Sequence, residues 1–261
     1  MFYGLATRKL DTGPWRFHHV LEDIQTLNER AILGELEVTA VSIHAYPSVS
    51  DKYALTSCGG SVGDGYGPLV VACQPMSTDD LRGRRIAVPG ELTTAFLALN
   101  LLLGRGGFEH VVVPFDHIIE RVASGGVEAG LVIHEGQLTY HRHELHKVVD
   151  LGEWWKAQTG LPLPLGGNCV RRDLGIVAMK EVAGIIRRSI EYSLEHRREA
   201  VEHALRYARD MGQDLADRFV GMYVNHWTLD YGDLGRRAIQ ELLSRGRDMG
   251  MVAPVGAIDF V

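Results

Sequence analysis

The stretch LPLPLGG, residues 161–167, decides the fold of this 261-residue chain. Segments of strand and helix character alternate before it, whereas from about Asp173 onward the pattern is almost wholly helical. Proline and glycine mark boundaries between such segments. We therefore interpret LPLPLGG as a crossing that separates an α/β part of the chain from a helical part.

Strand-like segments before this crossing are rich in apolar and β-branched residues and stop at turn residues. Because they alternate with helical segments, we expect βα units and a largely parallel sheet that is covered on both faces. The predicted strands are Val38–Tyr46, Leu69–Cys73, Arg85–Val88, His110–Phe115, Glu128–Ile133 and Lys147–Leu151, and the predicted helices between them are Leu21–Ala31, Thr93–Leu103 and Asp116–Ala123.

Two crossings explain this order economically. A first α/β half ends in the strand Leu69–Cys73, a second half follows, and the chain returns through Gly166–Arg172 to helices that complete the first half. We therefore expect two lobes joined by a hinge, with lobe 1 from residues 1–71 and 172–261 and lobe 2 from residues 72–171. Ligands favour the cleft between such lobes. The alternative is a single α/β domain with a helical appendage.

Charge and composition exclude several classes of protein. Lys and Arg number 27 and Asp and Glu 33, so a net charge of −6 gives no general attraction to nucleic acid or to an anionic membrane. The cysteines Cys58, Cys73 and Cys169 are widely spaced, which indicates reduced thiols rather than a disulfide scaffold. No apolar run approaches a membrane span, and the first residues do not match a secretory signal.

The strand-like segment Glu128–Ile133 ends in His134-Glu135-Gly136. Residues just beyond the carboxyl ends of strands in a parallel sheet line the ligand crevice. A histidine there can act as a general base, because its ordinary pKa lies near neutrality. The alternative is an ordinary hydrogen-bonded residue at a strand end.

Two further segments are expected beside the same crevice. In VPGELTTA, residues 88–95, a strand runs into a helix start, where free N–H groups and the hydroxyls of Thr93 and Thr94 suit a carboxylate or phosphate. At another strand end Ser42 offers a donor and an acceptor, with His44 and Tyr46 as its expected support. A plain threonine cap and an ordinary strand end are the alternatives.

Two other motifs carry less weight. GGSVGDGYGP, residues 59–68, lacks the G-x-G-x-x-G spacing of a dinucleotide site and precedes a strand, so we interpret it as a flexible loop next to a hinge. His141, His143 and His146 invite a metal-site interpretation. Because Arg142 lies among them and the first two would not share a helix face, a solvated surface segment is favoured.

Six blocks of the chain together point to one family of enzymes. They are VLEDIQTLNERAILGELEVTAVSIHAYP, SCGGSVGDGYGPLVVA, IAVPGELTTAF, VEAGLVIHEGQLTY, VVDLGEWWKAQTGLPLPLGGNCVRRDLG and YVNHWTLDYGDLGRRAIQELL. The chain resembles, from near residue 2 to residue 261, the 1,4-dihydroxy-6-naphthoate synthase family of menaquinone biosynthesis by the futalosine pathway. EAGLVIHE and the DLGEWW…GLPLPLG…RRDLG stretch are the most specific parts.

The resemblance implies a type 2 periplasmic-binding-protein-like α/β fold, with two lobes, two hinge crossings and a helical C-terminal third. It implies a cytoplasmic lyase that converts cyclic dehypoxanthinylfutalosine to 1,4-dihydroxy-6-naphthoate and dihydroxyacetone, without a metal or organic cofactor. His134 matches the family's proton acceptor. The substrate-contacting positions match Ala40, Val41 and Ser42 at the strand end and Thr93, Thr94 and Ala95 at the helix start.

The chain departs from the family pattern at its beginning. Family members carry a strand and a Pro-Cys-Pro-Asn-Asp-Thr-like loop before the segment that matches Phe2-Tyr3-Gly4, where Met1 stands here. We therefore expect the natural start to lie upstream, so that residues 1–261 lack a central strand of lobe 1 and one loop of the cleft. A damaged homologue is the alternative. If the natural start lies upstream, residues 1–261 are expected to fold poorly or bind weakly.

Two rival functions share the implied fold. One is the chorismate dehydratase of the same pathway, against which the VIHE and GLPLPLG blocks argue. The other is a non-catalytic solute-binding protein. The expected partner is a small aromatic carboxylate, with no nucleic acid or membrane, and the chain is expected to be a monomer or homodimer. Asn225 and Asp230, in YVNHWTLD, are candidates to reach the cleft from the helical part, with no role assigned to either.

Overall fold

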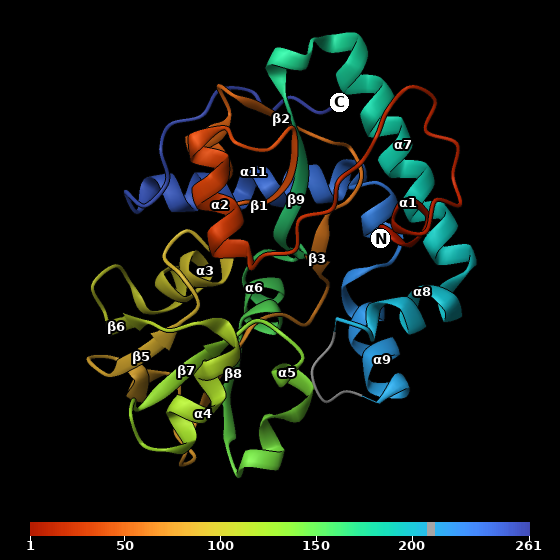
Figure 1. The fold of residues 1–261 in the computed structure, drawn as a ribbon. Coiled ribbons are helices and arrows are strands. Elements are labelled where there is room, and N and C mark those ends of the chain that lie inside the picture. Colours follow the sequence, from red (N-terminus) through yellow and green to blue (C-terminus); the bar gives the residue numbers. More distant parts are fainter. Residues whose placement is uncertain (208–211) are drawn as a thin grey trace.

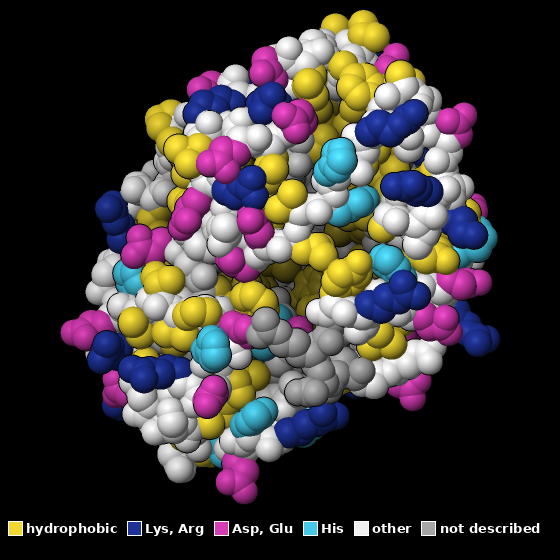
Figure 2. Space-filling model, viewed as in Figure 1, with side chains coloured by type: hydrophobic (Ala, Val, Ile, Leu, Met, Phe, Trp, Pro, Cys, Tyr) yellow, Lys and Arg dark blue, Asp and Glu magenta, His cyan; other side chains and the backbone are white. Residues whose placement is uncertain are grey.

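Two β-sheets organise the molecule, one in the upper and one in the lower part of Figure 1. The computed structural model describes residues 1–207 and 212–261. Helices α3 (Thr94–Leu103) and α6 (Leu151–Thr159) lie between the two sheets and contact each other. In the same view the surface is hollowed near its middle, and hydrophobic side chains lie inside the hollow (Figure 2).

The first sheet is built around β9 (Leu163–Arg171), the strand that contains most of LPLPLGG. β1 (Val38–Ser42) pairs with one edge of β9, and β2 (Tyr53–Leu55) and β3 (Ser61–Gly63) pair with the other. The register places Ser42 opposite Gly166 and Ala40 opposite Asn168. The proposed crossing is therefore itself the central strand of this sheet.

The second sheet has five strands, all drawn from the middle of the chain. Their order across the sheet is β6 (Glu109–Val112), β5 (Arg85–Val88), β7 (Ala129–Val132), β4 (Leu69–Ala72) and β8 (His146–Asp150). The chain thus leaves the first sheet after β3 and returns to it at β9. The lobe boundaries after residues 71 and 171 stay a prediction.

The expectation of a largely parallel sheet is wrong. β5 pairs in parallel with β6 and β7, but β4 runs antiparallel to β7 and β8. Every pairing of β9 is also antiparallel. The reason is that β4 and β9 are the strands by which the chain changes sheets, so neither belongs to a βα unit that would impose the parallel direction.

Capping residues set several boundaries that the sequence pattern missed by a few positions. α2 (Ile24–Leu33) begins after Asp23, whose carboxylate accepts the N–H groups of Gln25 and Thr26, and it ends at Gly34 in the left-handed conformation. The predicted strand Val38–Tyr46 stops at Ser42, because the chain turns there into a 3₁₀ segment, Tyr46–Val49.

From Ile176 most of the described residues are helical, as the sequence predicts. α7 runs along the first sheet, α11 packs on β9, and α8 and α9 lie at the side of the molecule in Figure 1. The short helices are α1 (Tyr3–Ala6), α4 (Ile118–Ala123), α5 (Gly136–Thr139) and α10 (His226–Leu229), and the longer ones are α7 (Ile176–Glu195), α8 (Arg197–Ala204), α9 (Gln213–Tyr223) and α11 (Gly232–Asp248).

One apolar core extends through both parts of the molecule. It joins Val41 of β1, Leu97 of α3, Leu131 of β7 and Leu242 of α11, all of which are fully buried. Fully buried Trp155 of α6 belongs to the same core, and its indole N–H donates to the Pro162 carbonyl at 3.0 Å. Burial of this core therefore holds the start of β9 and the residues just before it in place.

β1 lies at the edge of the first sheet, beside a groove of about 530 Å³. Residues 15–22 form part of the groove wall and belong to no helix or strand. The amide nitrogen of Asn168, which is also part of the lining, is buried without a hydrogen-bond partner among the described residues. The absence of a first strand from this sheet stays a prediction.

Candidate active site

His134 lies in the turn between β7 and α5, where the sequence predicts it. Its side chain is 14% exposed, and the ring of Phe115 packs against it edge-on at 5.3 Å between centroids. Nδ1 accepts the Gly136 N–H at 3.0 Å, and Nε2 is buried with no hydrogen-bond partner among the described residues. In a neutral ring with this contact the proton resides on Nε2, which is therefore a donor.

Gln137, which follows Gly136, makes the hydrogen bonds that hold this turn in place. Its backbone N–H donates to the His134 carbonyl at 2.9 Å, and its side-chain amide donates to the Val132 carbonyl at 3.2 Å. Its remaining oxygen accepts the Tyr223 hydroxyl at 2.7 Å. Sequence reasoning missed both Gln137 and Tyr223, because nothing local indicates that the end of α9 meets the start of α5.

Asn225 and Asp230 have different surroundings. Asn225 caps α10 by accepting the Trp227 N–H at 3.0 Å, and its amide group donates to the Met222 carbonyl at 3.0 Å. It lies within 3.5 Å of the Tyr66 hydroxyl, beside Tyr223. Asp230 instead accepts the Gly232 N–H at 2.8 Å and pairs with an arginine of α7. Through Tyr66 and Tyr223, Asn225 is thus connected to the part of the molecule that contains His134.

Ser42 ends β1, where it is held by Asn28 of α2. The Ser42 N–H donates to the Asn28 side-chain oxygen at 2.8 Å, and the Asn28 amide donates to the Ser42 hydroxyl oxygen at 3.0 Å. The expectation that His44 and Tyr46 support Ser42 is wrong, because their polar atoms contact backbone carbonyls elsewhere. The sequence signal that could have identified Asn28 is the presence of a polar residue on the buried face of the helix.

Thr93 caps α3, as the structural alternative proposed. Its hydroxyl donates to the Gly90 carbonyl at 2.8 Å and accepts the Phe96 N–H at 3.2 Å. The Thr94 hydroxyl is also engaged, since it donates to the Leu165 carbonyl at 2.6 Å. The donors that this helix start keeps for a ligand are the N–H groups of Thr94 and Ala95, which have no intrahelical acceptor.

The end of β1 and the start of α3 meet at β9. The backbone N–H of His44 donates to the Thr94 hydroxyl at 3.1 Å, and that hydroxyl reaches Leu165 of β9. Ala40 and Val41 precede Ser42 along β1, and Ala40 lines the groove at the sheet edge whereas Val41 is fully buried. His134 is held separately, by the α5 turn and Phe115.

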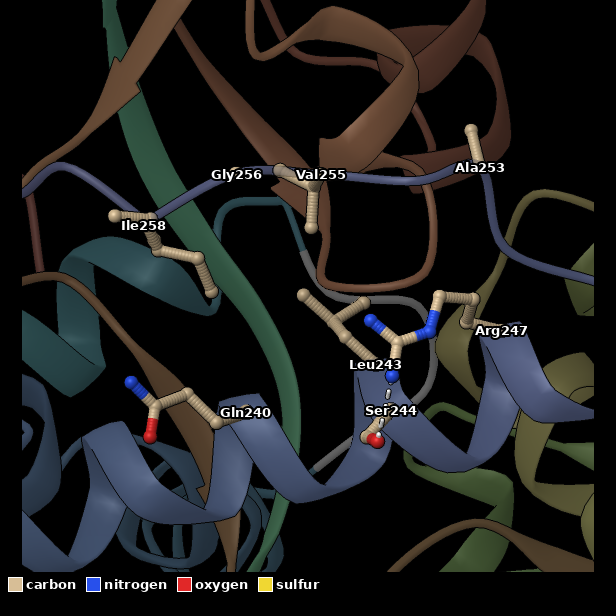
Figure 3. Close-up of a pocket in the computed structure, with 9 residues that line it drawn as sticks. Gln240, Leu243, Ser244, Arg247, Ala253, Val255, Gly256 and Ile258 are labelled. Atoms are coloured by element: carbon tan, nitrogen blue, oxygen red, sulfur yellow. Dashed lines mark hydrogen bonds between the residues drawn. The ribbon is translucent and has the colours of Figure 1, made fainter.

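Other candidate features are limited. Among residues 1–207 and 212–261, no three His, Cys, Asp or Glu side chains are placed to hold a metal ion, and all three cysteines are free. Within the same residues no helix has the length and apolarity to cross a membrane. A cavity of about 190 Å³ between α11 and the C-terminal tail is lined by Leu243, Arg247 and Ile258 (Figure 3) and by none of the predicted site residues.

The fold is similar to that of periplasmic solute-binding proteins. A ligand-binding component of an ABC-type import system from Staphylococcus aureus superimposes with a TM-score of 0.66 at 11% identity, covering 90% of this chain and 81% of that one. The alkanesulfonate-binding protein of Xanthomonas axonopodis pv. citri gives 0.63 at 12% identity, covering 88% and 81%. These likenesses show the fold, and they confirm the expected periplasmic-binding-protein-like architecture of type 2.

Closer relatives then define the family. A family model described as menaquinone biosynthesis matches residues 1–248. The 1,4-dihydroxy-6-naphthoate synthases of Thermus thermophilus and Streptomyces coelicolor are 42% and 41% identical, over 97% and 90% of this chain and 92% and 84% of theirs. A crystal structure of an Archaeoglobus fulgidus protein is 45% identical with a TM-score of 0.91, covering 96% and 93%. The chain belongs to this menaquinone-biosynthesis family.

Proposed function

We propose that this protein is a carbon–carbon lyase, a 1,4-dihydroxy-6-naphthoate synthase of menaquinone biosynthesis. It converts cyclic dehypoxanthinylfutalosine to 1,4-dihydroxy-6-naphthoate and dihydroxyacetone. The observation that carries the proposal is 42% identity to the Thermus thermophilus synthase over 97% of the chain. We also propose that it acts in the cytoplasm, as a monomer or homodimer, on a small aromatic carboxylate.

His134 is proposed as the general base. Its buried Nε2 lacks a partner among the described residues, and a substrate hydroxyl would supply one. To accept a proton there, the neutral ring must carry its own proton on Nδ1 instead, which requires the Gly136 N–H to release that nitrogen. Glu135, whose carboxylate oxygen is 3.6 Å from Nδ1, is placed to accept the Nδ1 proton and favour this tautomer.

The substrate carboxylate is proposed to bind at the start of α3. The N–H groups of Thr94 and Ala95 and the positive end of the helix dipole suit an anion there. Ala40, Val41 and Ser42, with Thr93 as the cap, form the remaining part of the proposed subsite. Closure of the first-sheet part and the second-sheet part over the substrate excludes water and fixes the orientation of the substrate. Aromatisation of the product then drives the bond cleavage forward.

A direct assay tests the proposal. The purified protein is incubated with the cyclic substrate, and the naphthoate is followed by mass spectrometry. We expect wild-type protein to form the product and the His134→Ala variant to bind substrate without turning it over. Near-normal turnover by that variant would remove His134 from the mechanism.

The likeness to import-system binding proteins supports a second candidate, a non-catalytic binding protein. Recovery of bound, unchanged substrate from wild-type protein would favour that function. Product formation from chorismate in a parallel assay would instead favour the related dehydratase.

A further inference from the structure

A single side-chain contact joins the C-terminal helices to the turn that carries His134. The Tyr223 hydroxyl, at the last residue of α9, donates to the side-chain oxygen of Gln137 at 2.7 Å across 86 residues of sequence. Gln137 is 5% exposed, so water cannot readily replace the tyrosine. This contact therefore connects an element of the helical third with α5 of the second-sheet part.

Gln137 has its polar groups committed to the same turn. One N–H of its side-chain amide donates to the carbonyl of Val132, at the end of β7, and its backbone N–H donates to the carbonyl of His134. Tyr223 satisfies the acceptor that remains. Because the amide plane of Gln137 is rigid, fixing its oxygen also fixes the direction of the N–H group that holds the end of β7. A displacement of the tyrosine hydroxyl is thus transmitted through this amide to Val132, two residues before His134.

Tyr223 is itself held firmly on the opposite side. Its ring packs edge-on against Tyr66 at 5.8 Å and against Phe219 at 5.4 Å. The Tyr66 hydroxyl donates to the Met222 carbonyl, which fixes the residue next to Tyr223. Burial raises the pKa of Tyr223, so its hydroxyl stays protonated and able to donate.

We propose that Tyr223 is a positioning residue for His134, and that it acts through Gln137, whose side-chain amide it holds in place against the end of β7. The proposal rests on the proposed role of His134 in the lyase reaction. In this proposal the Tyr223–Gln137 hydrogen bond orients the His134 imidazole. It is not needed to hold the fold together, because the aromatic contacts around Tyr223 remain when the hydroxyl is removed.

The primary test is the Tyr223→Phe variant, which removes one oxygen and keeps the ring. We expect kcat to fall about fivefold, the factor that a typical net hydrogen bond represents, with KM within about twofold of wild type. Tyr207→Phe is the matched control, because Tyr207 is 61% exposed and the same atom is removed. Gln137→Met is the second variant, and adding Tyr223→Phe to it is expected to cause no further loss.

A second measurement separates positioning from general stability. The ring ¹⁵N resonances of His134 are expected to shift in Tyr223→Phe and to stay unchanged in Tyr207→Phe. Unshifted His134 resonances in Tyr223→Phe would overturn the proposal, and so would a kcat equal to that of wild type. If wild-type protein forms no naphthoate, the lyase assignment fails, while the resonances still test the coupling.

Discussion

The Asn28–Ser42 pair allows a quantitative prediction about the stability of the candidate site. Asn28 is fully buried and Ser42 is 2% exposed, and two hydrogen bonds of 2.8 and 3.0 Å join them. The Asn28→Leu substitution keeps a similar volume and removes both bonds. It leaves the Ser42 N–H buried without an acceptor. The apolar leucine side chain fills the space of the asparagine, so that no water can bind to this N–H.

The cost follows from these contacts. A buried donor without a partner costs about 1–3 kcal/mol, and losing the second hydrogen bond adds about 1 kcal/mol. We therefore expect Asn28→Leu to lower the free energy of unfolding by about 2–4 kcal/mol. For a protein of this size that corresponds to a fall in Tm of roughly 4–16 °C.

Urea denaturation and calorimetry measure this effect, with two comparison variants. Ser42→Ala loses only the hydroxyl contact and is expected to cost about 1 kcal/mol. Glu29→Leu changes an exposed position of the same helix and is expected to stay within about 0.5 kcal/mol of wild type. A Tm of Asn28→Leu equal to that of the Glu29→Leu control, or a Ser42→Ala variant as unstable as Asn28→Leu, would refute the reasoning.

Two titrating groups give further predictions. Burial lowers the pKa of His44, whose ring nitrogens lie 3.1 and 3.2 Å from the carbonyls of Thr93 and Met251. The unfolded chain therefore binds a proton at this histidine more readily than the folded chain does. As a result, the free energy of unfolding falls as the pH drops below about 6.5. His44→Gln should weaken this dependence in urea titrations between pH 7.5 and 5.5, and an unchanged slope would contradict it. Burial raises the pKa of Asp150, the cap of α6, to about 6, so its contribution to stability is lost as pH rises through that value. Asp150→Asn keeps a capping side chain, so it should raise Tm at pH 7.5 and leave Tm unchanged at pH 4. An equal rise in Tm at both pH values would show that titration of Asp150 is not the cause.

Several elements could be predicted from local sequence because local forces set them. The strand Arg85–Val88 is observed with the predicted bounds, and the helix up to Leu103 begins after Thr93 as its capping pattern indicates. The position of His134 two residues beyond a buried strand is likewise a local property. In each case the signal lies within a few residues of the feature, where periodicity and caps act.

The strand directions and the supporting contacts could not be predicted in this way. β9 pairs antiparallel with three strands from the first quarter of the chain, and no local pattern specifies such partners. The same holds for Asn28, whose role depends on how α2 packs against β1, and for Tyr223 and Gln137, which are 86 residues apart. These features arise from long-range burial, which brings together side chains that are distant in sequence.

The α/β composition, the helical last third and the family could be inferred from the sequence alone, because periodicity, caps and extended motifs are written along the chain. The folded structure was needed to show that LPLPLGG forms the central strand of a sheet and that the Thr94 hydroxyl is engaged by Leu165. It also decided that the buried Nε2 of His134 stays unpartnered among the described residues while Nδ1 accepts a backbone N–H. Hydrogen-bond partners inside a protein depend on which groups are buried together, and that is settled only when the whole chain has folded.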